Sequence, residues 1–540
     1  MSGGPLVVAV DCSTTAAKAV VADASGAVVA TGAAPLTTAT PAPGFHEQDA
    51  TAWFDATLAA VGSAVGALTG ADRARVTAMA ITHQRESFVL LDADGAPLRP
   101  AILWVDSRAS KQIARLGSQP LPGGRSVHDV SGKPPDTTPA IYKLAWLAEH
   151  EPGVVARAAY LADVQAYLAL RLTGRLATSH ASADTLGLFD LEHLTWSPAL
   201  LTAAGLDAAG LDAAGLDAAA GRPRVSRRGV SRGEAATATS QDARPGGIGL
   251  PTLVAGGEAI GGLLPDVAER LGLEPGVTLV AGIGDGQSAG IALGVEEPGV
   301  AYLNLGTSMV CGVAAGTYLT SPAFRTLAGV RPGTYILETV LNAAAYVADW
   351  AARFAGSDVT TMETAAAAVP PGAEGLLVLP YWNAAQTPHW DPLARGAVVG
   401  WHGRHTPAHL YRAVLEGVAF ELRLQLGLLE AATGTSAREL RAVGGGARSP
   451  LWAQVVASVT GRRVRVCADG EVSAAGAAIQ AHAWIAGPAD AGPSPVNRFV
   501  AAGHDIVPEP GDVAVYDGLY PAYATLYPAL RETFARLSGA

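Results

Sequence analysis

The chain has 540 residues, of which 49% are hydrophobic and 16% are charged, and its formal net charge is −11. A chain of this length exceeds what one hydrophobic core usually serves, so two domains are expected. The negative charge argues against a nucleic acid or an anionic membrane as partner, because long-range attraction would have the wrong sign.

The cysteines and the apolar runs bear on the compartment. Cys12, Cys311 and Cys467 are widely spaced and form neither a CxxC pair nor a disulfide framework, so we expect buried thiols. No basic region precedes the first apolar run, as a signal peptide would require. The uncharged run 298–324 is long enough to span a bilayer, but its Asn, Gly and Pro residues suit a turning hairpin better. We therefore expect a soluble, cytoplasmic protein.

The first expected strand, Leu6 to Val10, leads into a carboxylate and a group of hydroxyl residues. Asp11 is followed by Thr14, Thr15 and Lys18. These residue types after an apolar strand are what a backbone needs to turn beneath a phosphate and its metal ion. The glycines of a Walker A motif are absent, so any nucleotide site is of another type. The alternative is a turn whose hydroxyl groups cap local backbone amides.

The segment 81–87, Ile-Thr-His-Gln-Arg-Glu-Ser, follows another expected strand. It places Gln84, Arg85 and Glu86 where donors and acceptors can bind neighbouring hydroxyl groups of a polyol. The alternative is an exposed, solvated arginine and glutamate. Between such strands the chain shows helical patterns, as at 52–68 and 410–431, and this alternation indicates α/β layers.

A low-complexity segment begins at residue 203. Residues 203–217 are three copies of Ala-Ala-Gly-Leu-Asp, and an arginine-rich stretch continues to residue 249. Its low complexity and its sparse large apolar side chains predict a mobile surface loop. An alternative, in which the arginines bind an acidic partner, stays open.

A single carboxylate, Asp285, lies among small residues after the apolar run that begins at Leu279. One interpretation is that it caps a helix beginning near Gln287. In a phosphoryl-transfer site it would instead lie where a substrate hydroxyl must lose its proton, and the neighbouring glycines would leave room for that substrate.

Two later segments repeat the pattern of an apolar strand that ends in small residues. The run 300–305 turns into a second apolar stretch at 309–313, which suggests two related halves that bind one phosphate chain. The run 440–443 enters three glycines before an expected helix, where a phosphate or a flat ring can approach the backbone closely. A flexible turn is the alternative. The candidate residues here are Gly306, Thr307, Gly445, Gly446 and Ala447.

Together, in this order, these segments resemble the FGGY carbohydrate kinases over almost the whole chain. Segments 387–396, 400–403 and 410–417 look like the family's C-terminal signature, and 143–146 with 149–152 looks like part of its N-terminal one. The resemblance implies two actin-like, ribonuclease-H-like α/β domains with the active site in the cleft between them. Residues 1–296 would form a sugar-binding domain, and 297–540 a nucleotide-binding domain.

The resemblance also implies a mechanism, in which the γ-phosphoryl group of ATP passes to a terminal hydroxyl of a small sugar. Asp285 would be the general base, and Asp11 and Asp285 would hold Mg²⁺. Ser13 departs from the glycine usual in the first turn. Residues implied to line the phosphates are Thr14, Thr15, Lys18, Gly306 and Thr307, and those bordering adenosine are Gly445, Gly446 and Ala447.

The sugar itself is less well defined. Gln84-Arg85-Glu86 is similar to the glycerol kinases, whereas typical xylulokinases carry Gln-Met-His there. Trp104, Asp106 and Arg108 look more like the pentulose kinases. The implied substrate-binding residues are Gln84, Arg85, Glu86, Trp104, Asp106 and Asp285.

The leading expectation for the substrate is a ketopentose such as D-xylulose, and glycerol or another polyol is the alternative. A non-catalytic actin-like protein that binds ATP and a sugar is an alternative of another class, but such a protein would be expected to lose Asp285, which is present. We expect no nucleic acid and no membrane among the partners. A homodimer is compatible with this interpretation.

Overall fold

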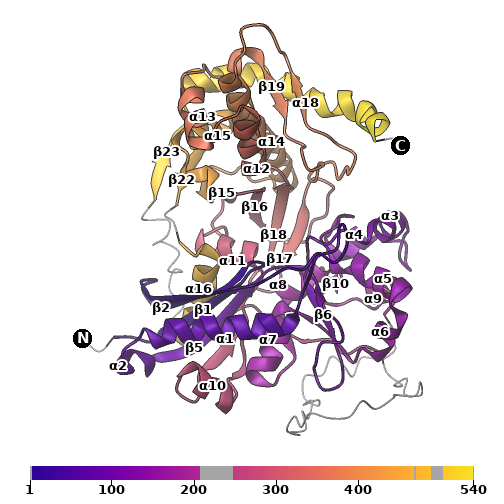
Figure 1. Cartoon of the computed structure of the whole chain (residues 1–540), viewed down its shortest axis with the longest axis vertical. Coiled ribbons are helices and arrows are strands. Elements are labelled where there is room, and N and C mark those ends of the chain that lie inside the picture. Colours follow the sequence, from indigo (N-terminus) through magenta and orange to yellow (C-terminus); the bar gives the residue numbers. More distant parts are fainter. Residues whose placement is uncertain (1–2, 207–246, 468–469, 488–502, 539–540) are drawn as a thin grey trace. The chain divides into compact units, whose positions relative to one another are not determined.

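The structure is a computed structural model that describes residues 3–206, 247–467, 470–487 and 503–538 (Figure 1). The chain divides into two compact units. A single cut, such as the expected one between 296 and 297, cannot represent this division, because two later segments belong to the first unit. The first unit comprises Met1–Ala289, Leu327–Gly333 and Ser473–Pro495, and the second comprises Gly290–Thr326, Thr334–Val472 and Val496–Ala540.

Most of the low-complexity segment predicted as a loop, 203–249, lies outside the described residues, which stop at 206 and resume at 247. Ala203 is the last residue of helix α9 (Pro198–Ala203), and Gly249 forms an isolated bridge with Tyr160. Both ends of the segment are thus attached to the first unit, and the interpretation of its repeats and arginines stays a prediction.

A six-stranded sheet with the order β13-β14-β5-β1-β2-β3 is the centre of the first unit. β1 runs antiparallel to β2 and parallel to β5, and β14 runs parallel to β5. The carboxyl ends of β1, β5 and β14 therefore meet at one edge of the sheet. The strands are β1 (Leu6–Cys12), β2 (Ala16–Asp23), β3 (Val28–Pro35), β5 (Val76–His83), β13 (Ala259–Gly262) and β14 (Thr278–Val280).

Helices cover both faces of this sheet. They include α1 (Ala50–Gly66), α7 (Val164–Thr173), α10 (Pro265–Leu271) and α16 (Val472–Ala486). Helix α5 (Ala140–His150) is a further helix of the unit that does not pack on this sheet. Leu6 and Val8 pack in one hydrophobic cluster with Trp53 of α1, whereas Val7 packs in another with Ala477 of α16. Because alternate residues of a strand point to opposite faces, a strand covered on both faces is hydrophobic at every position. This explains the apolar run that the sequence shows here.

A four-stranded sheet, β4-β7-β6-β8, also belongs to the first unit. β6 follows the Gln84-Arg85-Glu86 segment, and β7 precedes Trp104. Because Phe88 of β6 pairs with Ile102 of β7, this sheet brings the two predicted sugar-binding segments together. Its strands are β4 (Glu47–Gln48), β6 (Phe88–Leu91), β7 (Ala101–Ile102) and β8 (Tyr160–Asp163).

The second unit repeats the topology of the first. Its sheet has the order β17-β18-β16-β15-β21-β22-β23. From β18 to β23 the pairings are antiparallel, antiparallel, parallel, parallel and antiparallel, the same series as from β3 to β13. The chain therefore contains two related halves, as the sequence predicts. The strands are β15 (Val300–Leu305), β16 (Met309–Ala315), β17 (Arg325–Ala328), β18 (Tyr335–Leu341), β21 (Glu439–Val443), β22 (Arg463–Val466) and β23 (His504–Ile506).

Helix α14 (Pro407–Thr433) is largely buried in the second unit and includes the helical pattern predicted at 410–431. Pro407 lies in its first turn, where the missing N–H costs nothing, and Gly434 ends it with a φ of 65° that favours glycine. Further helices are α12 (Ala345–Phe354), α13 (Val359–Ala367), α15 (Pro450–Thr460) and α18 (Pro510–Leu537). Among the described helices, none combines the length and apolar character that a membrane crossing requires.

Candidate active site

Three chain segments converge at the carboxyl edge of the first sheet. The Gln84 N–H donates to the Cys12 carbonyl (3.0 Å), and His83 forms a parallel bridge with Gly284. A side chain at Gly282 would meet the Ile81 carbonyl oxygen at 1.9 Å, so only glycine allows this approach. The edge therefore carries the ends of β1 and β5 together with the residue before Asp285.

Asp285 is the first residue of helix α11 (Asp285–Ala292) and lies beside Arg85. Its Oδ1 lies 3.3 Å from Arg85 Nε and accepts from the Gly286 N–H (2.8 Å). The Asp285 side chain is 38% exposed, and its Oδ2 makes no contact with a hydrogen-bonding group in the described part of the chain. One carboxylate oxygen is thus held by the protein, while the other is available to a ligand.

Arg85 and Glu86 are not the solvated pair that the sequence allowed as an alternative. The Arg85 side chain is only 10% exposed and is directed at Asp285. Glu86 is buried, and its φ of 64° is uncommon for a residue with a side chain. Its N–H donates to Thr185 Oγ1 (3.3 Å). A strained, buried carboxylate beside an exposed one is typical of a functional site.

Gln84, Thr14 and Trp104 form one hydrogen-bonded group. Thr14 Oγ1 donates to Gln84 Oε1 (3.2 Å), and Trp104 Nε1–H donates to Thr14 Oγ1 (2.9 Å). Gln84 is buried, whereas Trp104 is 36% exposed. This group ties the predicted phosphate turn to both predicted sugar-binding segments. The exposed indole offers a flat apolar face on which a sugar can lie.

Asp106 has a different setting from the other predicted substrate residues. Its carboxylate is fully buried and makes two hydrogen bonds to Arg108, both of 2.8 Å. It also accepts from the His46 N–H (2.6 Å). These bonds position the loop after Trp104, and a direct contact of Asp106 with the sugar stays a prediction.

Lys143 was not assigned a role from the sequence, although it lies in the family-like segment 143–152. It is fully buried, and its Nζ donates to four backbone carbonyls, including those of Trp104 (3.2 Å) and Thr138 (2.7 Å). Burial lowers its pKa to about 8, although Glu86 opposes this shift. A lysine flanked by apolar residues on a helix is the signal that could have identified it. Gln48 was missed as well; its Nε2 donates to the Thr14 carbonyl (2.6 Å).

The predicted phosphate residues of the first unit lie around the β1–β2 turn. Asp11 is buried and pairs across the strands with Lys18, which is half-buried, while Thr15 is exposed. Ser13 closes the turn, because its N–H donates to the Ala16 carbonyl (3.0 Å). Serine thus permits a tight turn where the family usually has glycine. Burial and the charge of Asp11 raise the pKa of the Cys12 thiol, so Cys12 stays protonated.

The predicted nucleotide residues of the second unit lie at the equivalent edge of its sheet. Gly306 and Thr307 form the β15–β16 turn, where Thr307 is exposed. Gly445 is also exposed, and a Cβ atom at this position would lie 3.8 Å from the Arg448 guanidinium. Gly446 and Ala447 are buried instead, so they would support a bound ring from behind.

Helix α16 packs on the face of the six-stranded sheet opposite α1, and hydrogen bonds join it to α11. Ser473 Oγ donates to the Asp285 carbonyl (3.2 Å), and Ser288 Oγ donates to the Ser473 carbonyl (2.7 Å). A side chain at Gly476 would lie 2.0 Å from the Ser288 carbonyl oxygen. The backbone position of Asp285 therefore depends on the close approach of the two helices.

We expect Gly476→Ala to lower the free energy of unfolding by about 1–3 kcal/mol, because the backbone of α11 must shift to make room. Turnover should fall as well, since Asp285 begins that helix. Urea unfolding and steady-state kinetics measure both. The matched control is Gly427→Ala in α14, where no atom lies within 4 Å of the new methyl group. The control should leave the free energy of unfolding unchanged or raise it. If Gly476→Ala lowers that free energy no more than the control does, the close contact between α16 and α11 is not important for stability.

These two α/β units of one topology, with a carboxylate at a sheet edge, have the fold of the two-domain, actin-like sugar kinases. The solved structure of xylulose kinase from Rhodospirillum rubrum matches with a TM-score of 0.83 and 26% identity, over 98% of this chain and 100% of that one. The N-terminal domain of the FGGY family of carbohydrate kinases matches residues 6–213, and its C-terminal domain matches residues 301–484. The chain belongs to the FGGY family of carbohydrate kinases.

Two sequence relatives agree with this assignment. Xylulose kinase of Escherichia coli (strain K12) is 31% identical over 473 residues, which are 87% of this chain and 88% of that protein. Xylulose kinase of Streptomyces coelicolor is 32% identical over 490 residues, 90% of this chain and 89% of that one. The predicted family, fold class and enzyme class are thereby confirmed: the chain is a phosphotransferase that uses ATP and an alcohol acceptor on a carbohydrate.

Proposed function

We propose that the chain phosphorylates a ketopentose, with D-xylulose as the leading substrate. The observation that carries this is the half-exposed carboxylate of Asp285, which Arg85 holds at the carboxyl edge of the six-stranded sheet. The indole of Trp104, which is 36% exposed, is tied by its hydrogen bond with Thr14 to the turn that follows β1 at the same edge. The two relatives described above, both named xylulose kinase and aligned over 87% and 90% of this chain, support the choice of sugar.

In this proposal Oδ2 of Asp285 accepts the proton of the attacking sugar hydroxyl. Arg85 and the Gly286 N–H hold Oδ1, so the carboxylate cannot rotate away from the substrate. General bases act through such a fixed, unoccupied oxygen within hydrogen-bond reach of the hydroxyl. The oxygen of that sugar hydroxyl then attacks the γ-phosphoryl group of ATP in line.

Mg²⁺ would be held by Asp11, and Asp285 is a second candidate ligand. Carboxylate oxygens are the donors that Mg²⁺ prefers, and Asp11 lies directly before the turn that would hold the phosphates. When bound, the ion neutralises charge on the phosphate oxygens. Thr14, Thr15, Lys18, Gly306 and Thr307 would line the phosphates, and Gly445 would face the adenosine.

Glycerol is the second candidate substrate, because Gln84-Arg85-Glu86 is similar to the glycerol kinases. The structure offers a reason to rank it lower. The Arg85 side chain pairs with Asp285, a contact that does not depend on a particular polyol, and the Glu86 side chain is buried.

Coupled ADP release with Mg-ATP tests the substrate. The panel is D-xylulose, L-xylulose, D-ribulose, glycerol, erythritol and gluconate, with a control that lacks sugar. We expect the highest kcat/KM with D-xylulose. A preference of tenfold or more for glycerol would overturn the proposal and leave the family assignment intact.

Trp104→Ala should raise the KM for the preferred sugar about tenfold and change kcat less than threefold. An indole stacked on a ligand contributes about 1–1.5 kcal/mol, which this substitution removes. Trp104→Phe keeps the flat face but loses the hydrogen bond to Thr14, so it separates the two contributions. Trp401→Ala, a 53% exposed tryptophan of the second unit, is the matched control and should leave KM unchanged. Equal effects at both positions would rule out the stacking role.

We further propose a cytoplasmic enzyme, since the ATP substrate is made there and all three cysteines are buried free thiols. Neither a nucleic acid nor a membrane is needed as a partner. A homodimer stays a prediction, and light scattering of the purified chain would test it.

A further inference from the structure

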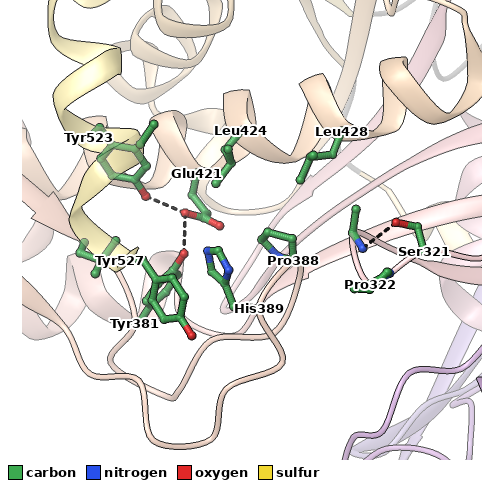
Figure 2. Close-up of a pocket in the computed structure, with 13 residues that line it drawn as sticks. Ser321, Pro322, Tyr381, Pro388, His389, Glu421, Leu424, Leu428, Tyr523 and Tyr527 are labelled. Atoms are coloured by element: carbon green, nitrogen blue, oxygen red, sulfur yellow. Dashed lines mark hydrogen bonds between the residues drawn. The ribbon is translucent and has the colours of Figure 1, made fainter. Parts of the chain in front are cut away.

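The second unit contains a cavity of about 380 Å³ that the kinase reaction does not use (Figure 2). Small-molecule sites in proteins usually occupy about 300–1,000 Å³, so this volume is sufficient for a compact ligand. The wall is formed by α14, α18 and the loops around residues 321–323 and 381–389. Its lining residues include Leu424, Leu428, Pro388 and Tyr527, which make most of the wall apolar.

One carboxylate faces this apolar cavity. Glu421 of α14 is fully buried, and its Oε2 accepts from the hydroxyl groups of Tyr381 (3.0 Å) and Tyr523 (2.7 Å). Its Oε1 receives only a long hydrogen bond, from Gln425 Nε2 at 3.3 Å. In Figure 2 the second carboxylate oxygen points away from the two tyrosines, toward His389 and Pro388.

No lysine or arginine contacts Glu421 among the described residues. Buried carboxylates are ordinarily paired with a cation or protonated. Here burial raises the pKa of Glu421 to about 7, although the hydrogen bonds from Tyr523, Tyr381 and Gln425 act to lower it. The group thus changes charge near neutral pH, where a cation placed beside it would favour the ionised form.

Aromatic rings surround the carboxylate. His389 stacks on Tyr527 with 3.7 Å between ring centroids, and Tyr381 meets both rings edge-on. Burial lowers the pKa of His389 to about 4, so this ring is neutral and does not repel a cation. Arg531, whose positive charge acts on His389, is exposed, and Asp391 accepts from the Tyr527 hydroxyl. Aromatic faces with a carboxylate are the recognition elements for organic ammonium ions.

We propose that this cavity binds a small organic ammonium ion with an apolar body, whose charged nitrogen pairs with Glu421 and whose body contacts Leu424, Leu428 and the rings of Tyr527 and His389. This site is separate from Asp285 and independent of which sugar the kinase uses. A neutral molecule of the same shape would leave the carboxylate without a counter-ion.

Saturation-transfer NMR and thermal unfolding of the full chain at pH 8 test the proposal with three probes: benzylamine, phenethylamine and tetramethylammonium. Benzyl alcohol, phenethyl alcohol and 2,2-dimethylpropane-1-ol are their neutral counterparts. We expect at least one ammonium probe to bind and to raise the unfolding temperature, and its neutral counterpart to bind at least tenfold more weakly. D-xylulose and Mg-ATP should not displace it.

Two variants show where the probe binds. Glu421→Gln keeps the shape and the hydrogen bonds of the tyrosines, and should weaken ammonium binding at least tenfold. Leu424→Trp fills the cavity and should also abolish binding, and it serves if the glutamine variant fails to fold. Trp401→Ala, outside the cavity lining, should bind normally. The proposal is wrong if no ammonium probe binds the native chain, or if binding survives in Glu421→Gln or Leu424→Trp.

The pH dependence of stability provides an independent check on Glu421. Because its folded pKa of about 7 lies above the ordinary 4.5, the folded state binds this proton more tightly than the unfolded state. The stabilisation is complete below about pH 4.5 and is lost as the pH rises to about 7. The drop in the urea midpoint between pH 5 and pH 7.5 should therefore be smaller in Glu421→Gln than in the native chain. An identical drop would mean that Glu421 does not titrate in this range.

Discussion

Asp285→Asn should lower kcat about 10³-fold while the affinity for Mg-ATP stays within about threefold of the native value. A positioned general base contributes 10²–10⁴-fold to a rate, and asparagine cannot accept the proton of the sugar hydroxyl. The amide oxygen can still accept from the Gly286 N–H, so the start of α11 should be preserved. Coupled ADP release measures kcat, and nucleotide titration measures the affinity.

The control for this variant is Asp55→Asn, which makes the same chemical change at an exposed position of α1. It should have native kinetics. If Asp285→Asn keeps a kcat within threefold of the native value, Asp285 is not the general base.

The largest loss of stability is expected for Asp184→Ala, which breaks a buried ion pair in the first unit. Asp184 Oδ2 accepts from Lys133 Nζ (3.0 Å) and from the Ala328 N–H (2.9 Å), and both charged side chains are at most 1% exposed. Removal of one partner of a buried ion pair costs about 3–5 kcal/mol, because here Lys133 loses the carboxylate of Asp184 while its own charge stays buried. Urea unfolding should show this as a lower midpoint.

Removal of both charges should cost less than removal of one. Lys133→Met with Asp184→Leu replaces the pair by apolar groups and should recover more than half of the loss, because no unpaired charge remains. Asp349→Ala breaks a surface pair with Arg353, whose side chains are 53% and 63% exposed, and should change stability by less than about 0.5 kcal/mol. A loss below 1 kcal/mol for Asp184→Ala would show that the buried pair is not needed.

Arg85 and Glu86 show how much of the candidate site can be predicted from the sequence. Their identity and their place at the end of a strand could be predicted, because an apolar run precedes them. Their directions could not, since the φ of Glu86 is positive and Arg85 pairs with a residue 200 positions later. The same holds for Lys143, whose four carbonyl partners belong to two separate segments.

Local patterns were sufficient to predict the elements of the fold. The strand at Leu6, the helices at 52–68 and 410–431 and the hairpin after Val300 are all confirmed, because strand and helix periodicity and turn residues act over a few positions. The division of the chain into two units could not be predicted from such local patterns. Segments 327–333 and 473–495 belong to the first unit through contacts far along the chain.

The sequence alone determined the family, the residue types at the ends of the strands and Asp285 as the candidate base, because these depend on local order and on motifs. Only the tertiary structure decided that Asp285 is held by Arg85, that Asp106 is an internal ion-pair partner and that Glu421 lines a cavity where no lysine or arginine of the described residues contacts it. The physical reason is that charge pairing, burial and close approach join residues that are distant in the chain, and no local pattern records which of them will meet.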